Sequence, residues 1–211
     1  SCDRSPIPGA NVLTDEARLP RSTPILVGAA IMMSLAMGMR QSLGLFLPPL
    51  TQDLAITASD FTFAIAVQNI AWGVFQAPIG ALADRVGLRP VLVSGSASYV
   101  VAVLIMLAAN DVALLALSGA LIGISVACTG SSLAMTATAR AVSAERRSLM
   151  LGIVGAFSSV GTLAIAPVLQ FMLARWDWRL AVGLFVLLAL AMLPAAFMAG
   201  AVDRVPQPPQ K

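Results

Sequence analysis

The stretch Gly80-Ala81-Leu82-Ala83-Asp84-Arg85-Val86-Gly87-Leu88-Arg89-Pro90 decides the fold, because it sets three charged residues between two long apolar runs. The preceding run, Phe61–Ala83, and the following run, Pro90–Ala109, each approach the ~20 residues that a membrane-spanning helix needs. The whole chain is 58% hydrophobic and 11% charged, whereas a soluble domain is roughly 45–50% apolar and about 25% charged. The stretch is therefore predicted to be a polar turn between two helices in a lipid bilayer.

Six apolar stretches of similar length follow one another along the chain, with brief polar breaks between them. A water-soluble core could not bury so much apolar surface, so we expect an all-α membrane protein with six transmembrane helices. The predicted spans are Pro24–Leu47, Phe61–Ala83, Pro90–Ala109, Val112–Ala139, Leu149–Ala174 and Leu180–Ala201.

Basic residues are unevenly divided between the two predicted membrane faces. Of the 13 Lys and Arg residues, ten fall in segments on one face, two fall on the other, and Arg40 lies inside a span. Cytoplasmic loops carry the excess of basic residues, so both termini are predicted to be cytoplasmic, in a plasma (inner) membrane. The net charge of +3 therefore indicates membrane orientation and no nucleic-acid partner. On this basis we expect a disordered cytoplasmic leader over residues 1–22, a six-helix transmembrane bundle over 23–202, and the start of a cytoplasmic linker or tail over 203–211.

The predicted spans fall into two triplets of nearly equal length, about Pro24–Ala109 and Val112–Ala201. Each triplet has a very short turn before its third span. Because three is an odd number, these two turns lie on opposite membrane faces. This is the pattern of a 3+3 inverted repeat, which is known from transporters.

Histidine is absent, and the two cysteines, Cys2 and Cys128, lie far apart. A Ser-His-Asp triad, an HExxH zinc site and a disulfide framework are therefore excluded. No nucleophile–base pair and no cluster of metal ligands is visible in the sequence. We expect no enzyme activity, no metal site and no cofactor.

The opening stretch resembles the loop signature G-x-L-a-D-r-x-G-r-k-x-x-l between the second and third helices of the major facilitator superfamily. The matching residues are Gly80, Leu82, Asp84, Arg85, Gly87, Arg89 and Leu92. The resemblance implies a gating motif, in which Gly80 allows close helix approach and Gly87 adopts a positive φ. We expect Asp84 to pair with Arg85 or Arg89, or to face the N-terminus of a neighbouring helix. A loop whose charges only orient the protein is the alternative.

Trp178-Arg179 at the start of the sixth span resembles the G-W-R of the same superfamily, with Asp177 in place of glycine. Two other family patterns are missing. Gly119 occupies the position of the fourth-helix arginine in R-x-x-x-G, and the fifth span lacks the antiporter sequence G-x-x-x-G-P. The small residues of these two spans are instead expected to allow close helix packing: Gly119, Gly123, Gly152, Gly155, Ala156, Ser159 and Gly161.

Met39-Arg40-Gln41-Ser42-Leu43-Gly44-Leu45-Phe46-Leu47-Pro48 resembles superfamily members related to oxalate/formate and monocarboxylate porters. In related carriers a basic residue of the first helix is linked to anion binding, so the resemblance implies that Arg40 binds the substrate. An arginine at the centre of a span costs roughly 2.5–3.5 kcal/mol, and snorkelling to the outer headgroups is the alternative.

The other candidate substrate-binding side chains are polar residues within the predicted spans: Gln41, Gln68, Asn69 and Gln170. Gln68 and Asn69 are adjacent, so they point about 100° apart on a helix and cannot both face one central cavity. Hydrogen bonds between helices are the alternative role for such residues.

Together these features predict the N-terminal six-helix half of a twelve-helix secondary transporter. Such a unit would move a small organic solute, such as a monocarboxylate or another organic anion, by alternating access. Its expected partners are the lipid bilayer, a small-molecule substrate, and a C-terminal six-helix half or a second copy. The alternative is a truncated or self-associating six-helix membrane protein without transport activity.

Overall fold

The computed structural model describes residues 10–204, with side chains from Ser22 onward, and the regular elements in this range are all helical. In chain order they are α1 (Ala10–Ser42), η1 (Leu43–Phe46), α2 (Leu47–Asp53), α3 (Ala58–Val86), α4 (Leu88–Leu107), α5 (Val112–Thr129), α6 (Ser131–Ala141), α7 (Ala144–Arg175), α8 (Trp178–Ala199) and η2 (Gly200–Arg204).

Six helical units within the described residues are long and apolar enough to cross a membrane. The first combines α1, η1 and α2, the fourth combines α5 and α6, and the sixth combines α8 and η2. The prediction of an all-α membrane protein with six spans is therefore confirmed. Residues 10–22 differ from the expected disordered leader, because they form the first turns of α1, where alanine, leucine, glutamate and arginine favour a helix. The rest of the leader, residues 1–9, lies outside the described residues.

Polar residues and glycine set the helix boundaries. Thr57 and Asp60 form a capping box at the start of α3, in which each side chain accepts a hydrogen bond from the backbone N–H of the other residue. The carboxylate of Asp111 accepts a hydrogen bond of 2.8 Å from the N–H of Leu114 and caps α5. Gly130 separates α5 from α6 within the fourth span. Short polar signals thus divide a chain that is otherwise continuously apolar.

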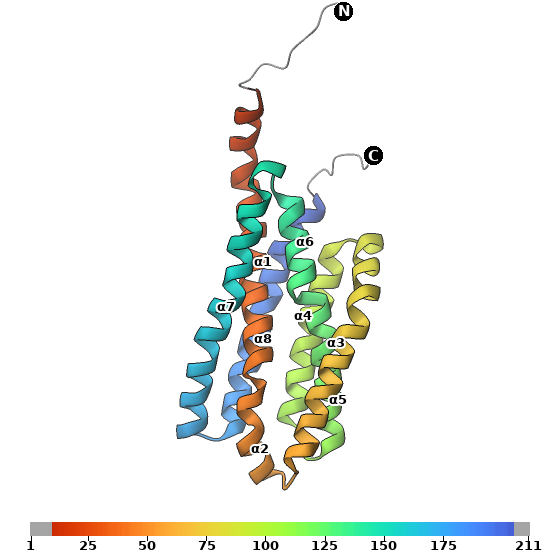
Figure 1. The fold of residues 1–211 in the computed structure, drawn as a ribbon, viewed down its shortest axis with the longest axis vertical. Coiled ribbons are helices and arrows are strands. Elements are labelled where there is room, and N and C mark those ends of the chain that lie inside the picture. Colours follow the sequence, from red (N-terminus) through yellow and green to blue (C-terminus); the bar gives the residue numbers. More distant parts are fainter. Residues whose placement is uncertain (1–9, 205–211) are drawn as a thin grey trace, which may run out of the picture.

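The helices run up and down, so the connections alternate between the two ends of the bundle (Figure 1). The α3–α4 turn, the α6–α7 turn and η2 lie at one end, whereas α2, the α4–α5 connection and the α7–α8 turn lie at the other. The α3–α4 and α7–α8 turns are therefore at opposite ends, as the inverted repeat requires. The triplets are interleaved, because α1 packs mainly on α7 and α8 while α3 packs mainly on α5.

Small residues allow several of these helices to approach closely. Alanine side chains at Gly119 and Gly123 would meet the backbone of α3, at Ala64 and Gln68 respectively. A side chain at Gly161 would meet the backbone of α1. The prediction of close packing holds at these three positions, in agreement with the role of small residues in membrane helix interfaces. Gly152 differs, because a Cβ there would meet no described atom within 4 Å.

Candidate functional site

Arg40 lies near the end of α1 and is held by two side chains of α3. Its Nη2 donates a hydrogen bond of 2.5 Å to Oδ1 of Asn69, and its Cζ lies 4.4 Å from the ring centre of Trp72. Asn69 and Trp72 are three residues apart on α3, so they share one face of that helix. The Nε atom of Arg40 is buried and has no hydrogen-bond partner in the described part of the chain. The guanidinium therefore makes a cation–π contact on one side and is only partly hydrogen-bonded.

Local hydrogen bonding fixes the acceptor that Asn69 offers. Its Nδ2 donates to the carbonyl oxygen of Ile65, one turn earlier, at 2.9 Å, which leaves Oδ1 to accept from Arg40. Tyr99 of α4 lies within electrostatic reach of Arg40, and its fully buried hydroxyl has no described hydrogen-bond partner. Among residues 22–204, no carboxylate forms an ion pair with Arg40. The charge of Arg40 is thus surrounded by neutral side chains.

Of the four polar side chains predicted beside Arg40, the structure brings only Asn69 to it. Gln68 is 2% exposed and packs beside Gly119 of α5, where it lines a small, mostly apolar pocket. Gln41 and Gln170 are exposed and make no hydrogen bond to Arg40 within the described residues. Trp72 was not among the candidate residues predicted from the sequence. Its position three residues after Asn69 could have indicated that the two side chains share one face of a helix.

The start of α4, just after the turn from α3, is capped by a residue of η2, the last described element of the chain. Gly87 adopts a φ of 95° between the two helices, which favours glycine as the sequence predicted. The carboxylate of Asp203 accepts hydrogen bonds from the N–H groups of Leu88 at 3.0 Å and Arg89 at 2.8 Å. A carboxylate in this position satisfies free N–H groups and complements the helix dipole. Asp203, placed by sequence in a tail, is therefore part of the bundle.

Asp84 forms an ion pair with Arg140 at the end of α6, with 2.9 Å between Oδ1 and Nη2. The expectation that Asp84 pairs with Arg85 or Arg89, or faces a helix N-terminus, is wrong. The last turn of α3 lies beside α6 in the folded bundle, and the N-terminus of α4 is already occupied by Asp203. The pair therefore links the second predicted span to the fourth.

Two other residues of the motif have simpler surroundings. A Cβ at Gly80 would meet no described atom within 4 Å, so the expected close helix approach is not made by any described element. The guanidinium of Arg89 lies 5.0 Å from the ring centre of Phe197 on α8, a cation–π contact. Arg85 is exposed.

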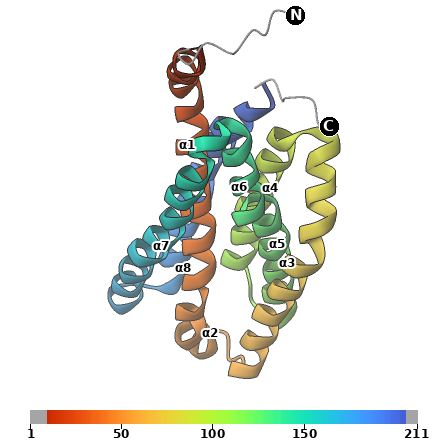
Figure 2. The ribbon, with the colours of Figure 1, turned by 45° about the horizontal axis from the view of Figure 1, so that its top comes forward.

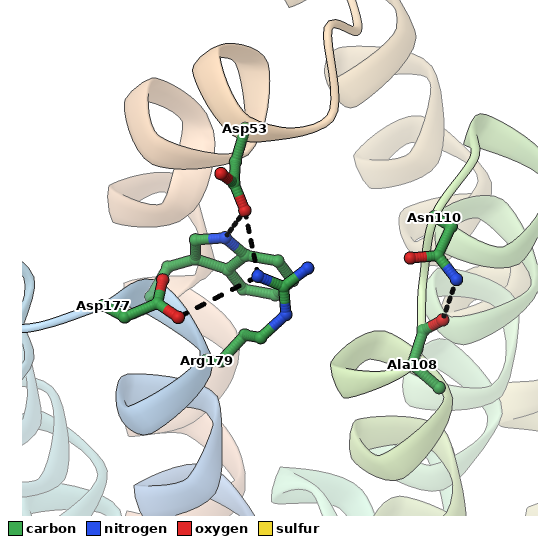
Figure 3. A network of polar contacts seen from close by, with 6 residues as sticks. Asp53, Ala108, Asn110, Asp177 and Arg179 are labelled. Carbon is green, nitrogen blue, oxygen red and sulfur yellow. Dashed lines mark hydrogen bonds and ion pairs between the residues drawn. The ribbon is translucent and has the colours of Figure 1, made fainter.

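A second polar cluster lies at the opposite end of the bundle, between α2 and the start of α8 (Figure 3). Oδ2 of Asp53 accepts hydrogen bonds from Nε1 of Trp178 at 2.7 Å and Nη1 of Arg179 at 3.1 Å. Arg179 also lies 3.9 Å from a carboxylate oxygen of Asp177. Trp178 is only 3% exposed, so it is a core residue. Sequence reasoning missed Asp53, because nothing local connects it to a residue 125 positions later.

The sequence-family model of the Major Facilitator Superfamily matches residues 29–211 of the chain. The chain belongs to the major facilitator superfamily. The match includes Arg40, both polar clusters and all six spans except the start of the first.

This superfamily member is similar in sequence to monocarboxylate transporter 11 of Mus musculus. The two sequences are 30% identical over 165 residues, which is 76% of this chain and 36% of the relative. The chain thus spans about a third of the length of the curated relative it matches.

The chemistry available at the Arg40 cluster is that of anion recognition. A guanidinium offers five N–H donors in one plane, and the described neighbours of Arg40 take only one nitrogen, Nη2. Among the described residues, no group of three or more His, Cys, Asp or Glu side chains could hold a metal ion. Arg40 therefore has unused N–H donors and no counter-ion within residues 22–204.

Proposed function

We propose that this chain forms a six-helix unit of a secondary transporter that moves a small organic anion by alternating access, with Arg40 binding the anionic group. Membership of the superfamily and the six membrane-length helices support the transporter assignment. A carrier of this kind has no covalent chemistry to perform, which agrees with the absence of histidine from the sequence.

The observation that carries the proposal is the neutral surroundings of Arg40. An arginine inside a span costs roughly 2.5–3.5 kcal/mol on insertion scales. Asn69 and Trp72 offset part of that cost by a hydrogen bond and a cation–π contact, but they carry no negative charge. A carboxylate that reaches Arg40 would supply the missing charge and form two parallel hydrogen bonds with the guanidinium.

We infer the substrate class from the same charge and from the relative. A single arginine without a second cation beside it suits one carboxylate, and the matching mouse protein is named a monocarboxylate transporter. Asn69 is the polar companion of Arg40 in this proposal. Within the described residues Gln41, Gln68 and Gln170 make no side-chain hydrogen bond to Arg40, so the proposal does not depend on them.

The 80–89 stretch is proposed to act as a gate on the cytoplasmic face. Asp84 and Arg140 join two spans by an ion pair, and Asp203 holds the N-terminus of α4 from a third. Arginines at positions 85, 89, 140, 146, 147 and 204 gather at this end of the bundle, which supports a cytoplasmic placement in a plasma (inner) membrane.

The proposed unit acts together with a second six-helix unit, either a C-terminal half or a second copy. Secondary transporters of this architecture place the substrate between two units that rock against each other. The rival function is a six-helix membrane protein that self-associates without transport. Uptake of a labelled solute by membranes containing the protein separates the two, because the rival predicts none.

The test of Arg40 uses cells that express the natural gene product and a panel of labelled monocarboxylates and dicarboxylates. Arg40→Ala is expected to abolish uptake and Arg40→Lys to weaken it, because lysine cannot reproduce the two-pronged hydrogen bond. An immunoblot checks that both variants reach the membrane in normal amounts. Undiminished uptake by Arg40→Ala would leave snorkelling as the better account. In the same assay, Asp84→Asn should reduce uptake at normal abundance, and unchanged uptake would make the loop merely an orientation signal.

A further inference from the structure

The Arg40 side chain bridges two helices that do not pack on each other. The main neighbours of α1 are α7 and α8, and the main neighbour of α3 is α5; Figure 2 shows α3 and α7 on opposite sides of the bundle. The guanidinium crosses from α1 to reach Asn69 and Trp72 on α3. Its orientation is therefore set by these two side chains and not by the packing of backbones.

The contact with Trp72 restricts the directions from which an anion can approach. The indole ring lies on one side of the guanidinium, with 4.4 Å between Cζ and the ring centre. Asn69 takes one of the two N–H groups of Nη2, and Nε is buried without a described partner. The second N–H of Nη2 and both N–H groups of Nη1 make no hydrogen bond to the described residues. An anion must therefore approach in the plane of the guanidinium, along the edge that includes Nη1.

We propose that Trp72 is a specificity-determining residue, and Asn69 a positioning residue, that make the Arg40 site prefer a planar carboxylate over a tetrahedral oxyanion. This inference rests on the proposed role of Arg40 in anion binding. A carboxylate lies in one plane and matches the edge of the guanidinium with two parallel hydrogen bonds. A sulfonate or phosphonate that forms the same two bonds must place its third oxygen and its alkyl tail on opposite sides of that plane, so one of the two always lies on the side of Trp72.

Electrostatic repulsion by the indole ring also favours a carboxylate over a tetrahedral oxyanion. The face of an aromatic ring carries negative potential and its edge positive potential. Whichever of the two groups lies on the side of Trp72 meets the bulk of the indole, and an oxygen there also meets this negative face. A carboxylate has neither group out of the plane. Asn69 keeps the guanidinium plane fixed, because its Oδ1 is oriented by the hydrogen bond from Nδ2 to Ile65. Without either residue the guanidinium could turn to suit either shape of anion.

The test compares two probes with the same charge and a similar tail, butyrate and propane-1-sulfonate. Their dissociation constants are measured from the thermal stabilisation of the purified, detergent-solubilised natural protein. We expect the wild type to bind butyrate more tightly than the sulfonate. Trp72→Leu should weaken butyrate binding by about tenfold, between the scales of an exposed and a desolvated cation–π contact, and bring the ratio of the two constants close to one. Trp72→Phe should give an intermediate ratio, because it keeps an aromatic face.

Matched control variants come from the same chain. Trp176 is 55% exposed and packs against Phe171. Within the described residues the Asn110 amide bonds only to the carbonyl of Ala108, two positions earlier (Figure 3). Trp176→Leu and Asn110→Ala should leave both constants unchanged. Asn69→Ala should weaken butyrate binding more than sulfonate binding.

The outcomes separate the two proposals. Equal butyrate binding by wild type and Arg40→Ala, or no stabilisation of the wild type by either probe, overturns the role of Arg40 and this inference with it. Loss of binding in Arg40→Ala, together with an unchanged ratio in Trp72→Leu, overturns only the role of Trp72. If Trp72→Leu does not fold, as judged by gel filtration, the ratio in Trp72→Phe decides.

Discussion

Replacing Gly161 with alanine tests the crossing of α1 and α7, which holds the first span in place. A Cβ built on Gly161 would lie 2.5 Å from Oγ of Ser34 and 2.6 Å from its carbonyl carbon, with the carbonyl oxygen nearer still. The approach is mutual, because a Cβ on Gly38 would lie 2.8 Å from the carbonyl carbon of Gly161. The hydroxyl of Ser34 can rotate away, but the backbone atoms can move only if α1 shifts.

The size of the effect follows from two opposing terms. Overpacking of a close contact costs typically about 1–3 kcal/mol, and a backbone neighbour places Gly161→Ala towards the upper part of that range. Alanine favours a helix over glycine by at most about 1 kcal/mol, which offsets part of the loss. A net destabilisation of about 1–2 kcal/mol remains. For a domain of this size it corresponds to a fall of roughly 2–8 °C in melting temperature.

The control is Gly152→Ala on the same helix. A Cβ there would meet no described atom within 4 Å, so the substitution carries the helix-propensity gain without the clash. Both variants are purified in detergent, heated in steps, and assayed by the monodisperse fraction on gel filtration. Gly161→Ala should melt below the wild type, and Gly152→Ala at or above it. Coincident melting of the two variants would refute the close crossing of α1 and α7.

Two further substitutions probe the polar side chains. Asp53→Asn keeps an oxygen acceptor for Trp178, whereas Asp53→Ala leaves the buried Nε1 of Trp178 without a partner, at a cost of about 1–3 kcal/mol. The melting temperature should fall from wild type to Asp53→Asn and again to Asp53→Ala. Equal melting temperatures of the two variants would show that only the charge matters. Tyr99→Phe removes a buried hydroxyl that has no described partner and should raise the melting temperature; a fall would reveal a hidden hydrogen bond.

The six spans could be predicted because hydropathy is a local property. The predicted third span, Pro90–Ala109, and the observed α4, Leu88–Leu107, differ by two residues at each end. A helix that is apolar on all sides carries little information on how it is rotated or which neighbours it meets. The sequence therefore could not show that Asp203 caps α4 or that Trp72 stacks on Arg40, since both depend on the interleaved packing of distant helices.

The predicted substrate cluster illustrates the same limit within a single turn of helix. Gln68 and Asn69 are adjacent, and both were candidates on chemical type alone. Packing turns Gln68 towards Gly119 of α5 and Asn69 towards Arg40 of α1. The 100° between neighbouring positions required that they separate, but only the fold decides which of the two meets the arginine.

Two long-range ion pairs, Asp84–Arg140 and Asp53–Arg179, occupy related places in the inverted repeat. Asp84, beside the turn between the second and third spans, pairs with Arg140 at the end of the fourth. Arg179, beside the turn between the fifth and sixth spans, pairs with Asp53 at the end of the first. The inversion relates the first span to the fourth and one turn to the other, so the same contact is made once at each end of the bundle with the charges exchanged. Each arrangement pairs one carboxylate with one guanidinium, so both triplets make the same kind of contact. The acidic and basic residues stand at exchanged positions, so a comparison of the two triplets by residue identity cannot detect the contact.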